Sequence, residues 1–273
     1  MVRRELTRTT LSVAGSDPSG GAGVQMDIKC FAAAGVHGCC AITAVVAQNT
    51  TGVRSVHPIP ARVVGEQLDS VFDDFKISAM KTGMLYGAST ANVVATKAAE
   101  QGTALIVDPV LSASRGAPIS RPDLLKALRE WLIPNAILVT PNIPEAERLA
   151  GMDIRGEDDM RRACREIRAL GCGSVLLKGG HMPDGQANDM FFDGRFRMFR
   201  GPRLDHDVHG TGCMLSAFIT ALLGKGCPLP RSIGLAKGYV TEIIRSSSHI
   251  GKGMEIGDPF IGLRSSSRFL PRQ

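Results

Sequence analysis

The stretch His209-Gly210-Thr211-Gly212-Cys213-Met214-Leu215-Ser216-Ala217-Phe218 places a turn of small residues directly before an apolar helical pattern. The first turn of a helix leaves backbone N–H groups unpaired and carries a partial positive charge, so an anion can bind there. Gly210 and Gly212 have no side chains and let an anion approach the backbone closely. The stretch therefore predicts a phosphate-binding turn that opens a helix, with an ordinary glycine-rich helix start as the alternative.

Cys213 falls within the first turn of this predicted helix. The positive field at that position lowers the pKa of a thiol, which makes the thiol a usable base or nucleophile. A buried thiol without a chemical role is the alternative.

Outward from this turn, short apolar runs alternate with helical patterns, which is typical of a parallel sheet covered on both faces. The predicted strands lie near residues 10–14, 39–46, 77–81, 104–108, 137–140 and 174–178. The predicted helices lie near residues 21–34, 61–75, 88–100, 121–131, 158–170, 212–223 and 229–247. An Asp193-Gly194 turn between two apolar runs predicts a hairpin. We therefore expect a three-layer α/β fold, with a mainly parallel central sheet, helices on both faces and a small antiparallel edge hairpin.

The chain has 273 residues, of which 44% are hydrophobic and 21% are charged, enough for one sizeable α/β domain. We expect a single domain over residues 1–273 with an ordered core of about residues 8–262. The net charge of +6 suits an acidic ligand, but the basic residues are scattered and only 5% of residues are aromatic. This pattern argues against nucleic-acid binding and favours an anionic small molecule.

The seven cysteines form no paired framework and no repeated C-x-x-C pattern, so reduced thiols are expected. The N-terminal residues lack the apolar core of a secretory signal, and no stretch approaches membrane-spanning length. We therefore expect a cytoplasmic protein without a membrane partner.

Polar and glycine-rich segments follow the predicted strands. Because ligands bind at the carboxyl ends of parallel strands, side chains in these segments are candidates for a binding site. The candidates are Gly15, Asp27, Gln48, Met84, Asp108, Asn142, Glu145 and Lys178. Asp27 can accept a hydroxyl hydrogen bond, and Gln48 offers a donor and an acceptor to the edge of a heterocycle. The alternatives are core packing for Met84 and plain surface charges for Lys178 and Glu145.

These segments, in this order, resemble the hydroxymethylpyrimidine/phosphomethylpyrimidine kinases of thiamine biosynthesis, members of the ribokinase-like superfamily, over nearly the whole chain. The matching pieces are the phosphate-binding turn and Ala14-Gly15-Ser16-Asp17-Pro18-Ser19-Gly20-Gly21-Ala22-Gly23, Ala41-Ile42-Thr43-Ala44, Ala47-Gln48-Asn49-Thr50, Lys81-Thr82-Gly83-Met84-Leu85, Asp108-Pro109-Val110, Thr140-Pro141-Asn142-Ile143-Pro144-Glu145-Ala146 and Lys178-Gly179-Gly180-His181. The resemblance implies a ribokinase-like fold and an enzyme that uses ATP and Mg²⁺. It implies transfer of the γ-phosphoryl group to the hydroxymethyl group of 4-amino-5-hydroxymethyl-2-methylpyrimidine. A second transfer onto the monophosphate, at the same site, then gives the diphosphate.

The resemblance also implies a pyrimidine pocket. Asp27 lies near the hydroxymethyl or amino group of the substrate in this assignment, and Gln48 lies at the ring edge. Met84 forms an apolar wall, with Gly15 beside it. A flat aminopyrimidine suits such a pocket, because it needs an amide at its edge and a soft apolar surface on its face.

The phosphate side of the site follows from the same resemblance. The residues implied for the migrating phosphoryl oxygens are Gly210, Thr211, Gly212 and Cys213. The residues implied for the nucleotide are Lys178, Asn142, Thr211 and Gly212. Lys178 neutralises phosphate charge, and Asn142 and Glu145 form an Asn-x-x-Glu element that organises Mg²⁺ through water. Asp108 joins this electrostatic cluster.

Cys213 raises the main mechanistic question, because sugar-kinase relatives carry an Asp there as the base for the attacking hydroxyl. A thiol with a reference pKa of about 8.5 is a poor base unless its site lowers that value. The helix start and Lys178 favour such a lowering, whereas a bound phosphate opposes it. The second transfer, onto a phosphate oxygen, needs no strong base. We therefore predict that Cys213→Ala slows the first transfer more than the second.

The sequence departs from the family pattern at Val208 and Met214, beside the turn, and in the tail 250–259. The sequence therefore does not specify the detailed contacts with the nucleotide. Arg115, in a segment that resembles a mobile loop, either reaches the substrate monophosphate or faces solvent.

Two other functions stay open. A pyridoxal or pyridoxine kinase is one, because close relatives share the cysteine-bearing turn and the fold. A vitamin-precursor-binding regulatory protein that has lost turnover is the other, and Lys178, Asn142 and Glu145 argue against it because a binder has no use for a phosphate site. The resemblance further implies a homodimer.

Overall fold

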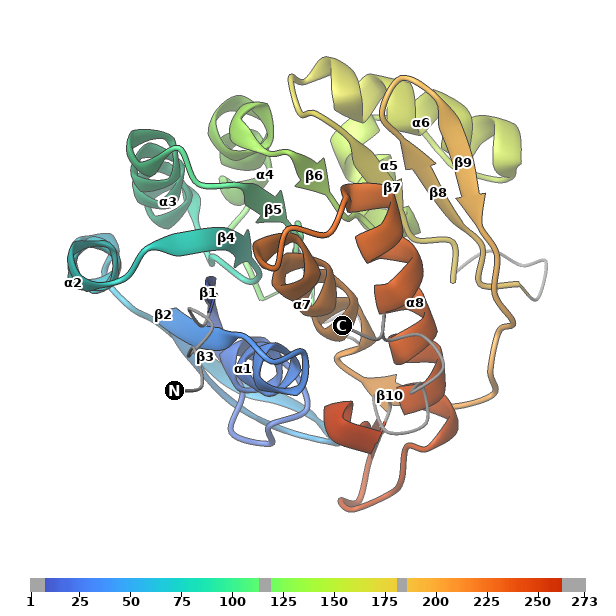
Figure 1. Cartoon of the computed structure of the whole chain (residues 1–273), viewed down its shortest axis with the longest axis horizontal. Helices are drawn as coiled ribbons and strands as arrows, with labels where there is room; N and C mark the ends of the chain where they lie inside the picture. The colour runs from blue at the N-terminus through green and yellow to red at the C-terminus, as the bar shows by residue number, and fades with distance from the viewer. Residues whose placement is uncertain (1–7, 113–118, 181–185, 262–273) are drawn as a thin grey trace, which may run out of the picture.

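Nine strands form one sheet through the described part of the chain, which comprises residues 8–112, 119–180 and 186–261 of this computed structural model (Figure 1). The strands are β1 (Thr9–Ser16), β2 (His37–Asn49), β3 (Gly52–Pro58), β4 (Ile77–Thr82), β5 (Leu105–Val107), β6 (Leu138–Val139), β7 (Val175–Leu177), β8 (Asp189–Phe192) and β9 (Phe196–Phe199). Their order in the sheet is β3-β2-β1-β4-β5-β6-β7-β8-β9. The pairs from β2 to β7 are parallel, whereas β3, β8 and β9 pair antiparallel at the two edges.

Two layers of helices cover this sheet (Figure 1). One face carries α1 (Gly23–Ala33), α7 (Thr211–Gly224) and α8 (Leu229–Arg245). The other face carries α2 (Ala61–Asp74), α3 (Ala88–Gln101), α4 (Leu124–Ala127), α5 (Ile143–Ala150) and α6 (Glu157–Ala169). The α4 helix continues into a π-helical turn, η1 (Leu128–Leu132), and a 3-10 turn, η2 (Ile133–Asn135). The predicted three-layer α/β fold is therefore confirmed.

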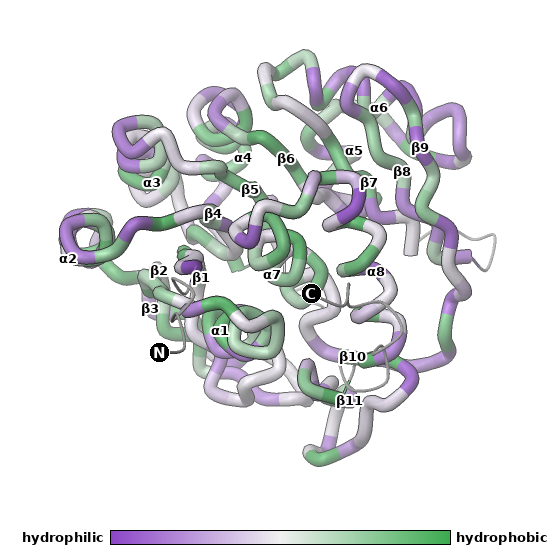
Figure 2. Tube along the Cα trace, viewed as in Figure 1, coloured by the Kyte–Doolittle hydropathy of each residue, from purple (hydrophilic) through white to green (hydrophobic). Residues whose placement is uncertain are grey.

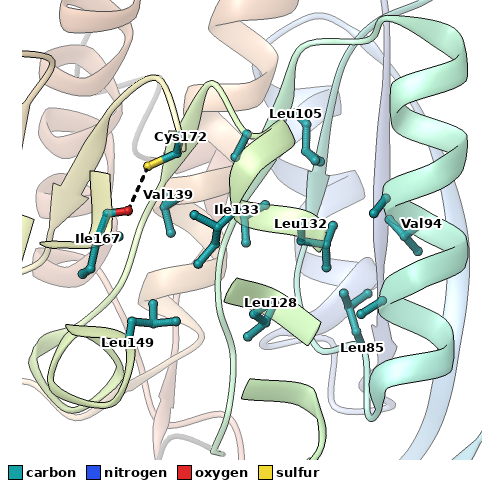
Figure 3. Close-up of a cluster of buried hydrophobic side chains, with 14 of the residues drawn as sticks. Leu85, Val94, Leu105, Leu128, Leu132, Ile133, Val139, Leu149, Ile167 and Cys172 are labelled. Carbon is teal, nitrogen blue, oxygen red and sulfur yellow. Dashed lines mark hydrogen bonds between the residues drawn. The ribbon is translucent and has the colours of Figure 1, made fainter. Parts of the chain in front are cut away.

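Side chains that alternate along the strands divide the core into two layers. On β4, Met80 packs into the layer beneath α2 to α6, whereas Ala79 packs into the layer beneath α1, α7 and α8. Figure 3 shows the first layer, in which Val139 of the sheet lies near Ile133 of the helical layer. In the same layer, the Cys172 thiol donates a hydrogen bond to a backbone carbonyl. Lys81, next to Met80 on β4, therefore faces the α1 and α7 side.

The α7 helix is apolar on almost every side, which is typical of a helix buried between other elements. Ten of its 14 residues are buried. It packs against α1, α8 and β4, and Figure 2 shows hydrophobic residues along its length. This packing holds the N-terminus of α7 at the carboxyl edge of the parallel strands.

Some elements differ from the sequence-based expectation. The predicted hairpin is present as β8 and β9, but a further antiparallel strand, β3, lies at the opposite edge and is mostly exposed. The short helix α5 begins one residue after Asn142, with Pro144 in its first turn. A separate two-stranded pair joins β10 (Val208–His209) to β11 (Glu255–Ile256). No helix among the described residues is both long and apolar enough to span a bilayer.

Candidate active site

The phosphate-binding turn opens α7 as predicted. Gly210 is the N-cap residue and adopts the left-handed region at φ 78°, where a side chain is strained. A Cβ on Gly210 would lie 2.0 Å from the carbonyl oxygen of Gly21, so the turn packs directly on the loop after β1. Within the described part of the chain, no side chain caps the helix. The first turn, which includes Thr211 and Gly212, is therefore a helix start whose N–H groups can bind an anion.

Lys178 lies over this turn. A Cβ on Gly212 would stand 3.2 Å from the Lys178 Nζ. The Lys178 amine donates to Asp108 Oδ1 at 3.0 Å. Burial lowers the pKa of Lys178, but Asp108 and Glu145 outweigh burial and raise the pKa. The lysine is therefore a fixed positive charge beside the unpaired helix start.

Asp108 is the centre of a buried polar cluster at the end of β5. Besides Lys178, it accepts hydrogen bonds from Thr140 Oγ1 and Ser216 Oγ, both at 3.1 Å. Thr140 follows β6 and Ser216 lies on α7. Hydrogen bonds to a charged acceptor are the strong ones, so this cluster holds the ends of the strands and α7 in register.

Asn142 and Glu145 form a capping box at the start of α5. Asn142 Oδ1 accepts from the Glu145 backbone N–H at 2.9 Å, and Glu145 Oε2 accepts from the Asn142 backbone N–H at 2.8 Å. Burial raises the pKa of Glu145 to about 7, with Lys178 opposing the rise and Asp108 adding to it. The Asn-x-x-Glu spacing thus has a structural cause, and it also places a second carboxyl group beside Asp108 and Lys178.

Cys213 lies in the first turn of α7, as predicted, and is partly buried. Burial raises the pKa of its thiol to about 11. Lys81 is the main charge that opposes this rise, while Asp27 and Asp108 add to it. The expected lowering of the pKa is therefore wrong, because burial outweighs the opposing charge of Lys81. A thiol with this pKa is mostly neutral at pH 7.

The acceptor side contains a small apolar cluster. Ala44 and Val46 of β2 pack with Met84 and Ile119. A Cβ on Gly15 would stand 3.0 Å from Met84 Sδ and 3.6 Å from Val46 Cγ2. The structure thus brings the predicted Gly15 and Met84 together. Gln48 is half-buried farther along β2, beyond a register shift in its pairing with β3.

Asp27 is in the interior, which differs from the open pocket wall expected for it. Its carboxyl group is completely buried. Oδ1 accepts from Lys81 Nζ at 2.7 Å, and Oδ2 accepts from Ser12 Oγ at 2.6 Å. Burial raises the pKa of Asp27, although Lys81 and Ser12 oppose that rise. A direct contact between Asp27 and a substrate stays a prediction.

Two functional candidates were missed in the loop after β1 and before α7. Asp17 Oδ2 and His209 Nε2 lie 3.1 Å apart, and Asp17 also accepts from the backbone N–H groups of Ser19 and Ala22. Although burial favours the neutral acid, hydrogen bonds from His209 and Ser19 hold the pKa of Asp17 below its usual value.

Arg115 lies outside the described residues.

The phosphomethylpyrimidine kinase family model matches residues 17–258. The chain belongs to the phosphomethylpyrimidine kinase family. It is 42% identical over 253 residues to the hydroxymethylpyrimidine/phosphomethylpyrimidine kinase of Rhizobium meliloti, a match that covers 91% of this chain and 95% of that protein. It is 45% identical over 248 residues to the thiamine biosynthesis bifunctional protein ThiED of Geobacter sulfurreducens. That match covers 90% of this chain but 51% of the relative, so the chain spans about half of its length.

A pyridoxal kinase of Bacillus subtilis, solved as a complex with ADP, shares the fold of this phosphomethylpyrimidine kinase family member. The TM-score is 0.86 at 33% identity, and the match covers 95% of this chain and 99% of that one. The predicted family resemblance and the ribokinase-like architecture are therefore confirmed. The roles of individual residues stay predictions.

Proposed function

We propose that this protein is an ATP-dependent kinase that phosphorylates 4-amino-5-hydroxymethyl-2-methylpyrimidine and then its monophosphate, giving the diphosphate for thiamine biosynthesis. The observation that carries the proposal is the fixed Lys178 amine over the uncapped helix start at Gly212. Membership in the family and a relative named for both phosphorylations support it. A protein that only binds a vitamin precursor has no need of this phosphate site.

The donor half of the site stabilises charge. N–H groups of Thr211, Gly212 and Cys213 bind the oxygens of the migrating phosphoryl group, and Lys178 neutralises part of their charge. Removing one such donor typically slows a reaction about 10²- to 10³-fold. During transfer the acceptor oxygen bonds to the γ-phosphorus while the bond from that phosphorus to the departing ADP breaks. The protein supplies position and charge for this exchange.

Asp108, Asn142 and Glu145 offer only oxygen atoms, which suits Mg²⁺. Among the residues that the structure describes, no three His, Cys, Asp or Glu side chains gather closely enough to hold a metal ion by themselves. If Mg²⁺ binds here, these residues would hold it together with phosphate oxygens and water, which suits the ion. When bound, the ion neutralises phosphate charge. The capping box lets Asn142 hold Glu145 toward this cluster, because each residue bonds the backbone of the other.

The acceptor half of the site is apolar at its base and polar at its edge. Met84 and Val46, beside Gly15, provide a surface for the face of the pyrimidine. Gln48 supplies the amide for the ring edge. Asp27 takes the predicted place near the hydroxymethyl or amino group if the carboxyl group gains access to the pocket.

The pyridoxal kinase alternative is favoured by one observation, the close structural match to the Bacillus subtilis enzyme. Both activities require the same donor half, so the acceptor decides between them. Mass spectrometry of purified protein with Mg·ATP and each acceptor separates the cases. Sequential appearance of pyrimidine mono- and diphosphate supports the proposal, and Lys178→Met should lose both products. If pyridoxal alone is phosphorylated, the protein is a pyridoxal kinase. If an acceptor binds without ADP formation, the protein is a regulatory protein.

We also propose a homodimer in the cytoplasm, on the resemblance to the family alone. Light scattering coupled to size-exclusion chromatography measures the oligomeric state, and fractionation of cells measures the location. A monomer across micromolar concentrations contradicts the homodimer.

A further inference from the structure

A shielded ion pair joins α8 to the start of β8. Lys237 of α8 donates to Asp189 Oδ2 at 2.6 Å, and the two side chains are only 13% and 8% exposed. Lys237 also donates to the backbone carbonyl of Ala187. Removing two charges from water is expensive, and replacing such a pair by apolar residues is often neutral or stabilising. Stability alone therefore gives little reason for this pair.

The second oxygen of Asp189 binds the segment that carries Lys178. Asp189 Oδ1 accepts from the Gly179 backbone N–H at 3.0 Å, in a buried position. Because β7 ends at Leu177, this bond extends the hold of β8 on the chain beyond the end of the strand. A Cβ on Gly179 would lie 1.9 Å from the carbonyl oxygen of Asn188, so the two segments are in close contact. The carboxylate therefore fixes the peptide group that directly follows Lys178.

The preceding side of Lys178 is anchored as well. Its backbone N–H donates to the carbonyl of Pro141 at 2.8 Å, and its backbone forms an isolated bridge with Asn142. Its amine donates to Asp108 at 3.0 Å and lies over Gly212. A lysine side chain is a flexible four-carbon stem, so a fixed amine position requires a fixed backbone. That backbone is held from the β6 side by these contacts and from the β8 side by the carboxylate.

We propose that Asp189, fixed by Lys237, is a positioning residue for the phosphate site: it holds the peptide after Lys178, so that the Lys178 amine lies over the start of α7. The inference rests on the proposed function, in which Lys178 neutralises phosphate charge. In this role Asp189 acts through Lys178 and needs no contact with either substrate. A misplacement of about 1 Å far from the reacting groups can cost about 10²-fold in rate, so a small shift of this peptide matters.

A merely structural ion pair predicts a different pattern. If the pair only joins α8 to the edge of the sheet, its removal affects nucleotide binding to the same extent whether or not Lys178 is present. A positioning role makes the effect of Asp189 on nucleotide binding depend on Lys178. A double-mutant cycle measures this dependence, because changes at residues that act through one another are not additive.

The test is a cycle of Asp189→Leu and Lys178→Met in the full chain, in which calorimetry measures the affinity for Mg²⁺ with a non-hydrolysable ATP analogue. Asp189→Leu alone should weaken binding about tenfold, which corresponds to about 1.4 kcal/mol. In the Lys178→Met background the same change should weaken binding less than about twofold. Asp189→Asn keeps an oxygen acceptor for the Gly179 N–H and should lose less affinity than Asp189→Leu.

Circular dichroism verifies the folding of each variant. If Asp189→Leu does not fold, Lys237→Met takes its place in the cycle, because Lys237 holds Asp189. Lys97→Met is the matched control, since Lys97 pairs with Asp69 at 2.7 Å between α3 and α2. Lys97 lies near the end of α3 that leads into β5, whereas the site lies at the carboxyl edge of the strands. This variant should keep the affinity for the analogue within about twofold of wild type.

Equal weakening by Asp189→Leu in both backgrounds overturns the positioning role of Asp189. Unchanged affinity in folded Asp189→Leu overturns it as well. Wild-type protein that binds the analogue but phosphorylates neither the pyrimidine nor its monophosphate overturns the proposed function instead. The binding cycle requires no turnover, so the two failures are distinguishable.

Discussion

The alkylation rate of Cys213 with iodoacetamide is expected to rise about tenfold per pH unit up to about pH 10 in the folded protein, because only the thiolate reacts. Burial raises the pKa of the Cys213 thiol from its ordinary value to about 11. Each pKa unit corresponds to about 1.4 kcal/mol, so a rise of about two units makes the thiolate about 3 kcal/mol less favourable than in the unfolded chain. At pH 7 the thiolate population is then about one in 10⁴, compared with about one in 100 for an unshifted thiol.

The assay follows the Cys213 peptide by mass spectrometry after brief alkylation at pH 7 to 10, with circular dichroism to verify folding at each pH. The same cysteine in urea-unfolded protein is the reference, and its rate should level off above about pH 9. Poor access alone makes the folded rate slow but leaves the levelling pH unchanged. If the alkylation rate of Cys213 in the folded protein levels off below pH 9, the argument that burial outweighs the helix start is refuted.

Three further predictions concern the turn and its supporting loop. Cys213→Ala should slow the first transfer about tenfold more than the second, less than the roughly 10²- to 10⁴-fold effect of a full general base because the thiol is mostly neutral; equal single-turnover losses contradict this. Gly210→Ala should abolish both transfers and lower the free energy of unfolding in urea by about 3 kcal/mol, from left-handed strain and overpacking against Gly21. Gly102→Ala is the control, because Gly102 has φ +57° and a Cβ there would meet nothing within 4 Å. This variant should lower the free energy of unfolding only by the left-handed strain of about 1–2 kcal/mol. Because the pKa of Asp17 is depressed by folding, its stabilisation is present at neutral pH and is lost as the pH falls below about 4. Asp17→Asn should flatten urea stability between pH 3 and 5, and an unchanged slope argues against this.

The sheet and the phosphate-binding turn could be predicted from the sequence because both rest on local patterns. The apolar run Leu105-Ile106-Val107 identifies the buried strand β5, and the small residues from Gly210 to Gly212 identify an uncapped helix start. Asn142 and Glu145 show the limit of such patterns. Their spacing fits a capping box as well as a metal-binding element, and the structure shows the box.

The partners of Asp27 and Asp17 could not be predicted, because they are distant in sequence. Lys81 lies 54 positions from Asp27, and His209 lies 192 positions from Asp17. A charged residue at the end of an apolar strand is a signal for Lys81, but it does not specify a partner. The prediction that the pKa of Cys213 is lowered failed for a related reason. The helix start is visible in the sequence, whereas burial depends on α1, β4 and α7 coming together.

The contact between Gly210 and Gly21 makes the two halves of the site depend on each other. The loop after β1 supplies Gly15 to the acceptor pocket, and its Gly21 carbonyl lies where any side chain on Gly210 would stand. The Asp17–His209 pair holds the same loop against the residue that precedes the turn. A shift of this loop therefore moves the acceptor pocket and the phosphate site together. Since a misplacement of about 1 Å between reacting groups can cost about 10²-fold in rate, this coupled loop is a reason to expect large effects from residues that touch neither substrate.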